Sequence, residues 1–173
     1  MFTYGKTMMR PIEEHDLETL RLMRNEQSTW MMLRSIKHVS EEDQRIWFRS
    51  LWADKTRAYY VVEDAGGGFV GMIRTDEYDP LNRSVRVGAD VAPALRGQGW
   101  GTAIYTMLLK WCFDYLNCHR VWLCVLNTNV AGKALYAKVG FKEEGRYRDA
   151  YFRDGCYVDE LVMSVLEDEY RTI

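Results

Sequence analysis

The alternation of hydrophobic and polar residues is clearest in the middle of the chain. Between residues 85 and 91, aliphatic side chains alternate with polar residues or glycine, which is the period-two pattern of a β-strand. Ile104, Leu108 and Cys112 then recur at four-residue steps, as on one face of a helix, and residues 121–125 form a second apolar strand. The pattern predicts a strand, a helix and a parallel strand joined by a right-handed crossover.

The flanking segments predict further strands and two earlier helices. One helix begins near Asp16, and Ser40 caps another, whose buried side is expected to include Ile46, Trp47, Leu51 and Trp52. The acidic run 76–80 is expected to be a solvated loop. Strands are expected at 6–10, 59–62, 69–74 and from 141, with a closing hairpin that turns at 153–155. Residues 1–173 are therefore expected to form one α/β (α+β) domain, with a mixed, twisted sheet of about six or seven strands and helices on both faces.

Composition narrows the class of protein. A chain of 173 residues is long enough for one core without disulfides, and its formal net charge of -2 gives no sign of binding nucleic acid or a membrane surface. No apolar segment has the length of a membrane span or the form of a signal peptide, so we expect a cytoplasmic protein. The four cysteines lack metal-ligand spacing, so no metal site is expected.

A glycine-rich turn joins the first strand of the crossover to its helix. Residues 96–101 read Arg-Gly-Gln-Gly-Trp-Gly, and three glycines in six residues allow backbone N–H groups to converge at a helix start. Such a site suits a phosphate or pyrophosphate. It has neither the Gly-Lys-Ser/Thr of a P-loop nor the Gly-x-Gly-x-x-Gly dinucleotide pattern. Two alternatives stay open: residues 96–101 form an ordinary turn, or they bind a different phosphate ligand.

Two motifs in order resemble the GNAT N-acetyltransferase superfamily. Arg96-x-x-Gly99-x-Gly101 resembles its acetyl-CoA pyrophosphate loop, and residues 129–141 resemble its second signature, an Asn-initiated helix with Leu-Tyr before Gly-Phe. The close resemblance runs from about residue 84 to 146. Gly132 departs from the family pattern, which more often has alanine at this position. Glycine inside a helix is about 1 kcal/mol less favourable than alanine.

The resemblance implies an enzyme that uses acetyl-CoA as donor, and it implies the donor contacts. The pantetheine arm would enter between the two splayed central strands. By similarity, the backbone of Val91 binds the pantetheine, the segment Arg96, Gly97, Gln98, Gly99, Trp100, Gly101 and Thr102 binds the pyrophosphate, and Asn127 or Asn129 binds the pantetheine or caps the next helix.

The resemblance also implies the catalytic groups. Tyr136 matches the tyrosine that protonates the departing CoA thiolate, although a packing role is the alternative. Arg86 holds the approximate place of the glutamate that serves many family members as general base. Asp90, on the same strand, is therefore our candidate base, with Asp76, Glu77 or solvent as alternatives.

The acceptor is expected to be a small-molecule amine, and several classes stay open. The chain is similar to the branch containing ribosomal-protein, spermidine and amino-sugar nucleotide N-acetyltransferases. A nucleotide-linked amino sugar is slightly favoured; a polyamine, a protein N-terminus and a non-catalytic acyl-CoA-binding module are the alternatives. The aromatic hairpin either lines the acceptor cleft or forms the edge of a homodimer. Basic residues suited to nucleotide phosphates are Arg24, Arg34, Lys37, Arg146 and Arg148; acidic residues suited to a polyamine are Asp76, Glu77, Asp79, Glu41 and Glu42.

Overall fold

A computed structural model describes residues 1–172, which form one eight-stranded sheet in the order β1-β2-β3-β4-β5-β6-β8-β7. Only β5 and β6 run parallel, as the crossover pattern predicts. The strand absent from the prediction is β1, whose three residues are too few to show a periodic pattern. The strands are β1 (Phe2–Tyr4), β2 (Thr7–Pro11), β3 (Ala58–Asp64), β4 (Phe69–Asp79), β5 (Ser84–Val91), β6 (Arg120–Leu126), β7 (Lys142–Arg153) and β8 (Cys156–Leu166).

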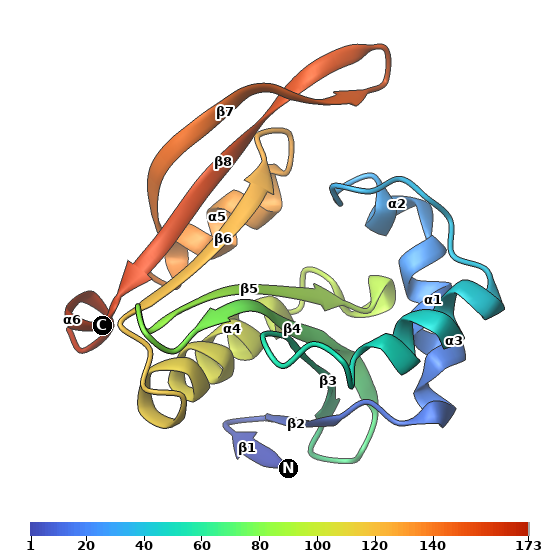
Figure 1. The fold of residues 1–173 in the computed structure, drawn as a ribbon, viewed down its shortest axis with the longest axis horizontal. Helices are drawn as coiled ribbons and strands as arrows, with labels where there is room; N and C mark the ends of the chain where they lie inside the picture. Colours follow the sequence, from blue (N-terminus) through green and yellow to red (C-terminus); the bar gives the residue numbers. More distant parts are fainter. Residues whose placement is uncertain (173) are drawn as a thin grey trace.

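Helices cover both faces of the sheet, as expected (Figure 1). Val61 and Val62 are fully buried neighbours on β3, and they belong to two separate hydrophobic clusters because successive strand residues point to opposite faces. The helices α1 and α3 pack on the Val61 side, and α4 packs on the Val62 side. The helices are α1 (Leu17–Asn25), α2 (Gln27–Trp30), α3 (Glu41–Ser50), α4 (Trp100–Lys110), α5 (Val130–Lys138) and α6 (Glu167–Tyr170), with short turns η1 (Glu14–Asp16), η2 (Pro93–Leu95) and η3 (Trp111–Tyr115).

The helix α3 begins at its predicted cap but buries a narrower face than expected. The Ser40 hydroxyl accepts a hydrogen bond from the Asp43 N–H. Trp47 and Phe48 pack against the cluster around Val61. Ile46, which we expected to be buried, is 57% exposed because only one turn-spaced stripe of the helix meets the sheet. Trp52, also expected to be buried, lies beyond the end of α3 at Ser50 and is 73% exposed.

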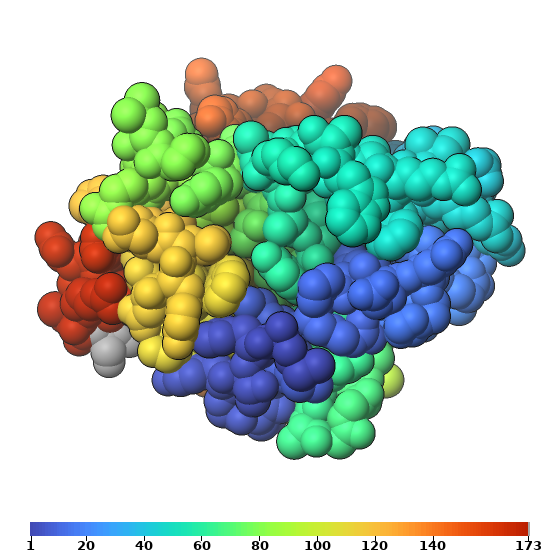
Figure 2. Space-filling view, turned by 60° about the horizontal axis from the view of Figure 1, so that its bottom comes forward, coloured from blue at the N-terminus to red at the C-terminus, as the bar shows by residue number. Residues whose placement is uncertain are grey.

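The N-terminal strand is held by the end of the crossover helix. The ring of Phe2 lies 5.2 Å from that of Trp111 and 5.0 Å from that of Tyr115, centroid to centroid. Figure 2 shows the first residues, in dark blue, packed beside this yellow segment. The helix predicted from the four-residue spacing therefore continues past Lys110 into η3. Two aromatic side chains of η3, Trp111 and Tyr115, cover β1.

The acidic run 76–80 was expected to be a loop, and this expectation is wrong. The strand β4 continues to Asp79, and Asp76 is only 8% exposed. Its carboxylate can be buried because Arg74 and Arg86 both lie within ion-pair distance of it.

The two parallel strands separate soon after they meet. They pair only from Ser84 to Arg86 on β5 and from Arg120 to Trp122 on β6. Beyond these pairs, β6, β8 and β7 turn away from β5, which leaves a gap between the strands at their carboxyl ends (Figure 1). Ligands of open α/β sheets bind at such a point.

Candidate active site

The glycine-rich turn follows β5, and its glycines are needed either for the backbone conformation or for close packing. Gly97 and Gly99 adopt φ values of 75° and 81°, in the left-handed region that glycine enters at low cost. Gly101 allows close packing, because a Cβ there would lie 2.9 Å from a methyl group of Leu135 on α5. No side chain caps α4 at Gly99, so the first amides of the helix stay available to an anion. Trp100 and Thr102 lie in this first turn.

Arg96, expected at the pyrophosphate, binds protein groups in this structure. Its guanidinium donates to the hydroxyls of Ser28 and Thr29, each at 2.6 Å, and to the Val91 carbonyl at 3.1 Å. Arg96 therefore ties the phosphate loop to α2 and to the end of β5. This contact could not be predicted from the sequence, because 67 positions separate Arg96 from Thr29.

Gln98 also binds its own loop, since its side-chain amide donates to the Ala94 carbonyl at 2.9 Å.

Two of the residues expected at the pantetheine border the gap between β5 and β6. The Ala92 N–H donates to Val70 on β4 at 2.9 Å, so the neighbouring backbone groups of Val91 point to the other side, into the gap. The side-chain oxygen of Asn127 is buried and has no hydrogen-bond partner among residues 1–172. Asn129 instead caps α5, where its side-chain oxygen accepts from the Gly132 N–H at 2.8 Å. Asn127 is thus the better placed of the two for a ligand.

Tyr136 lies on α5, partly buried against two aromatic rings. Its ring centroid is 5.1 Å from that of Tyr105 and 5.9 Å from that of Phe141. Burial raises the pKa of the Tyr136 phenol; the nearby Tyr105 hydroxyl opposes the rise and the Asp90 charge adds to it. The Tyr105 hydroxyl itself is buried without a partner in hydrogen-bond geometry among residues 1–172. Tyr136 is therefore protonated at neutral pH, as a proton donor must be.

A cavity of about 650 Å³ opens between α1, α3, the segment that follows α2 and the strands β3, β4, β5, β6 and β8. Asp90 belongs to its wall, whereas Tyr136 is not one of its lining residues. Its titratable wall is mostly basic. Six basic side chains line it, Arg24, Arg34, Lys37, Arg57, Arg74 and Arg86, together with four carboxylates, Asp43, Asp76, Asp90 and Glu160.

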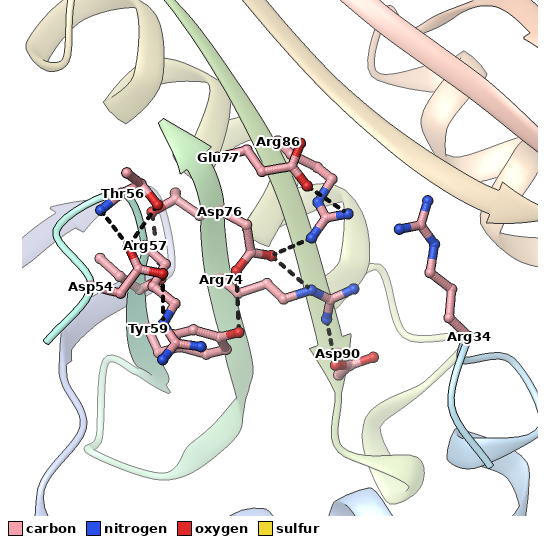
Figure 3. A network of polar contacts seen from close by, with 12 residues as sticks. Arg34, Asp54, Thr56, Arg57, Tyr59, Arg74, Asp76, Glu77, Arg86 and Asp90 are labelled. Atoms are coloured by element: carbon pink, nitrogen blue, oxygen red, sulfur yellow. Dashed lines mark hydrogen bonds and ion pairs between the residues drawn. The ribbon is translucent and has the colours of Figure 1, made fainter. Parts of the chain in front are cut away.

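Arg74 is the centre of a charged network on this wall (Figure 3). Its guanidinium lies 3.2 Å from an oxygen of Asp90 and 3.6 Å from an oxygen of Asp76. Gly88 makes room for it, because a Cβ there would lie 2.5 Å from the guanidinium. Asp90, our candidate base, therefore has one carboxylate oxygen engaged. Sequence reasoning missed Arg74, although a lone charged residue in an apolar strand was a signal.

The structure sorts the residues weighed for each acceptor. Arg24, Arg34 and Lys37 line the cavity, whereas Arg146 and Arg148 lie outside it on β7. Of the five acidic residues weighed for a polyamine, only Asp76 lines the cavity. The hairpin residues Tyr147, Tyr151, Phe152 and Tyr157 do not line it either.

Metal-ligand clusters and membrane spans are not found in residues 1–172. No three His, Cys, Asp or Glu side chains are grouped so that they could hold a metal ion. The described helices are also too short or too polar to cross a bilayer.

Comparison with known proteins identifies the family. The family described as an acetyltransferase (GNAT) domain matches residues 6–142. A spermidine N(1)-acetyltransferase of Vibrio cholerae is 26% identical over 162 residues, which are 94% of each chain. A putative ribosomal N-acetyltransferase of Bacillus subtilis is 32% identical over 104 residues, 60% of this chain and 57% of the relative.

A solved structure gives the same result in three dimensions. The crystal structure of the Vibrio cholerae spermidine N-acetyltransferase, in complex with CoA and spermine, superposes with a TM-score of 0.91 at 25% identity. The match covers 96% of this chain and 98% of the other. The glycine-rich loop, the strand gap and the family match agree: the chain belongs to the GNAT acetyltransferase family and is an acetyl-CoA-dependent N-acetyltransferase.

Proposed function

We propose that this enzyme acetylates a small primary amine bound in the 650 Å³ cavity, with Tyr136 as the proton donor to the departing thiolate. The position of Tyr136 carries the proposal. Its ring packs against Tyr105 on α4, the helix that begins at the phosphate loop, and burial together with the charge of Asp90 in the cavity wall raises the pKa of its phenol.

The donor would be held along the gap. Backbone N–H groups of the segment 97–102 bind the pyrophosphate, and the Val91 backbone and the Asn127 side chain bind the pantetheine. The unpartnered oxygen of Asn127 supports this role, because a buried polar atom without a partner costs about 1–3 kcal/mol. A pantetheine amide would supply the missing donor.

The transfer itself needs two proton movements. The neutral amine nitrogen attacks the thioester carbon, the new C–N bond forms, and the C–S bond breaks. The nitrogen gives up one proton, to Asp90 or to water beside it, while Tyr136 protonates the thiolate and is restored from solvent. Free CoA and the acetamide are the products.

Among the acceptor classes open from the sequence, the relatives support a polyamine better than a nucleotide-linked amino sugar. Spermidine N-acetyltransferases are similar over nearly the whole chain in both sequence and structure. A protein N-terminus has the support of the shorter match to the ribosomal enzyme. The basic charge of the cavity wall favours a different small amine.

The substitution Tyr136→Phe tests the proposed function. Removal of the hydroxyl should lower kcat about a hundredfold, since general acid catalysis contributes at least that much, and should leave acetyl-CoA affinity within about twofold. Steady-state CoA release and calorimetry measure the two effects. Tyr115→Phe, on an exposed ring stacked against Trp111, is the matched control.

Two results would count against the proposal. Unchanged turnover in the Tyr136 variant would remove the tyrosine from catalysis. Binding of acetyl-CoA without transfer to any amine, even by the unaltered protein, would favour the non-catalytic acyl-CoA-binding module.

A further inference from the structure

The acceptor cavity carries more positive charge than its own carboxylates neutralise. Each of the four carboxylates already has a basic partner within the protein. Glu160 accepts two hydrogen bonds from Arg34, at 2.6 and 2.8 Å, and is 3% exposed. Lys37 holds Asp43 at 3.0 Å, and Arg74 holds both Asp76 and Asp90. These groups have little capacity left for a polycation.

Arg24 is the charge without compensation. It ends α1, lines the cavity and forms no ion pair within residues 1–172. One terminal nitrogen, Nη2, donates to the Ser35 carbonyl at 2.6 Å. The other, Nη1, is buried and has no hydrogen-bond partner among the described residues.

The surroundings of Arg24 are unfavourable for a cation. Burial lowers the pKa of its guanidinium, the charge of Asp90 partly restores it, and the neighbouring charge of Arg74 lowers it further. Arg24 is half-buried, and its buried Nη1, with no partner and no carboxylate in residues 1–172, costs free energy unless a ligand supplies an anion. Arg34 lines the same cavity, and its side chain faces the strands that carry Arg74 and Arg86 (Figure 3).

We propose that the acceptor carries an acid group, a carboxylate or a phosphate, which pairs with Arg24 while its amine lies toward Asp90 and Tyr136. This inference rests on the proposed function. It deepens that function by replacing the polyamine with an amine that is anionic at its other end. A guanidinium and a carboxylate match in charge and in hydrogen-bond geometry, whereas a second ammonium group would meet Arg24 and Arg74 unfavourably.

The same positive wall would help the chemistry. Nearby cations favour the neutral form of an amine, which is the form that attacks the thioester. The proton that the nitrogen loses on attack still passes to Asp90 or to water, since Arg86 holds the approximate place of the glutamate that serves many family members as base.

Matched six-carbon amines test the proposal directly. Aminocaproate, hexylamine and hexamethylenediamine share the attacking amine and the chain length, and they differ in having an acid, a methyl or a second ammonium group at the other end. We expect kcat/KM for aminocaproate to exceed that for hexamethylenediamine by at least about tenfold, the size of one favourable exposed contact between unit charges. Aminohexyl phosphate distinguishes a phosphate from a carboxylate.

A variant of Arg24 shows whether this residue sets the preference. Arg24→Gln should reduce the ratio of kcat/KM for aminocaproate to kcat/KM for hexylamine about tenfold. Arg24→Lys keeps the charge and should keep most of the ratio. Arg21→Gln is the matched control, because Arg21 lies on the same helix and pairs with Glu18 outside the cavity.

The outcomes separate the two proposals. A diamine used as well as, or better than, the amino acid would overturn the acid-bearing acceptor and leave acetyl transfer to an amine standing. No transfer to these amines, to spermidine or to peptide N-termini would overturn both. If Arg24→Gln does not fold, the unaltered enzyme still decides, because rising salt should reduce the aminocaproate preference by screening.

Discussion

Ion pairs hold individual side chains of the cavity wall in place. Glu160 reaches Arg34 across 126 positions of sequence, and its two oxygens take two guanidinium nitrogens. The carboxylate is almost fully buried, while the Arg34 side chain remains 41% exposed. The pair therefore joins β8 to the segment after α2 and closes one side of the cavity.

We expect Glu160→Gln to lower the free energy of unfolding by about 1–3 kcal/mol, because Arg34 would lose a buried partner but keeps contact with water. Urea unfolding of both proteins measures the difference. Arg45→Gln is the control, since Arg45 and Glu41 form an exposed pair whose loss should cost less than about 1 kcal/mol. An equal loss of unfolding free energy in the two variants would show that burial of Glu160 adds nothing to the strength of its ion pair.

At this scale the sequence predicted the chemistry of single motif positions better than their contacts. Tyr136 lies on α5, the helix that its motif suggested, and its catalytic role stays a prediction. Arg74 could not be paired with Asp90 from the sequence, because their contact depends on the register of β4 against β5. Arg96 shows the same limit: its residue type suggested a phosphate, and the fold supplied Ser28 and Thr29.

At the scale of elements, the phosphate loop depends on backbone conformation. Gly99 stands at φ 81° immediately before α4, so its geometry sets the direction of the first helical amides. Nothing lies within 4 Å of the position a Cβ would take there. Any cost of adding a side chain must therefore come from the backbone itself.

Gly99→Ala should weaken acetyl-CoA binding about tenfold, because an L-residue pays about 1–2 kcal/mol in the left-handed region and relaxation would turn the amides away. Calorimetric titration with acetyl-CoA measures the change. Gly145→Ala, on β7, is the control: a Cβ there also meets nothing within 4 Å, and its φ is not positive. An unaltered dissociation constant for Gly99→Ala would remove this loop from the donor site.

At the scale of the whole molecule, two portions of the sheet share a short seam. The strands β1 to β5 and the strands β6, β8 and β7 are joined through three parallel residue pairs between β5 and β6. A donor lying in the gap would contact both portions. Its binding should therefore stabilise the fold as a unit. The exposed aromatic residues of the β7–β8 hairpin leave a homodimer as a prediction.

Acetyl-CoA at about a hundred times its dissociation constant should stabilise the folded protein by about 2.7 kcal/mol and raise Tm by roughly 5–10 °C. Thermal unfolding with and without the ligand measures this. ATP and NAD at the same concentration are the controls, since both carry phosphates without pantetheine. An equal shift with ATP would mean that the loop recognises phosphate alone.

The sequence by itself determined the local features of this protein. Period-two runs, a helical stripe and turn residues were enough for the crossover, for most strands and for the mixed sheet, because these patterns depend on neighbours along the chain. The glycine spacing and the Asn-to-Phe signature were enough for the family.

Tertiary structure decided what depends on residues far apart. It extended β4 through an acidic run, because Arg86 on the adjacent strand shares Asp76 with Arg74. It also assembled the cavity and left Arg24 there without a carboxylate. Net charge along the chain is nearly balanced, but the charge of a cavity depends on which side chains the fold brings to face one another.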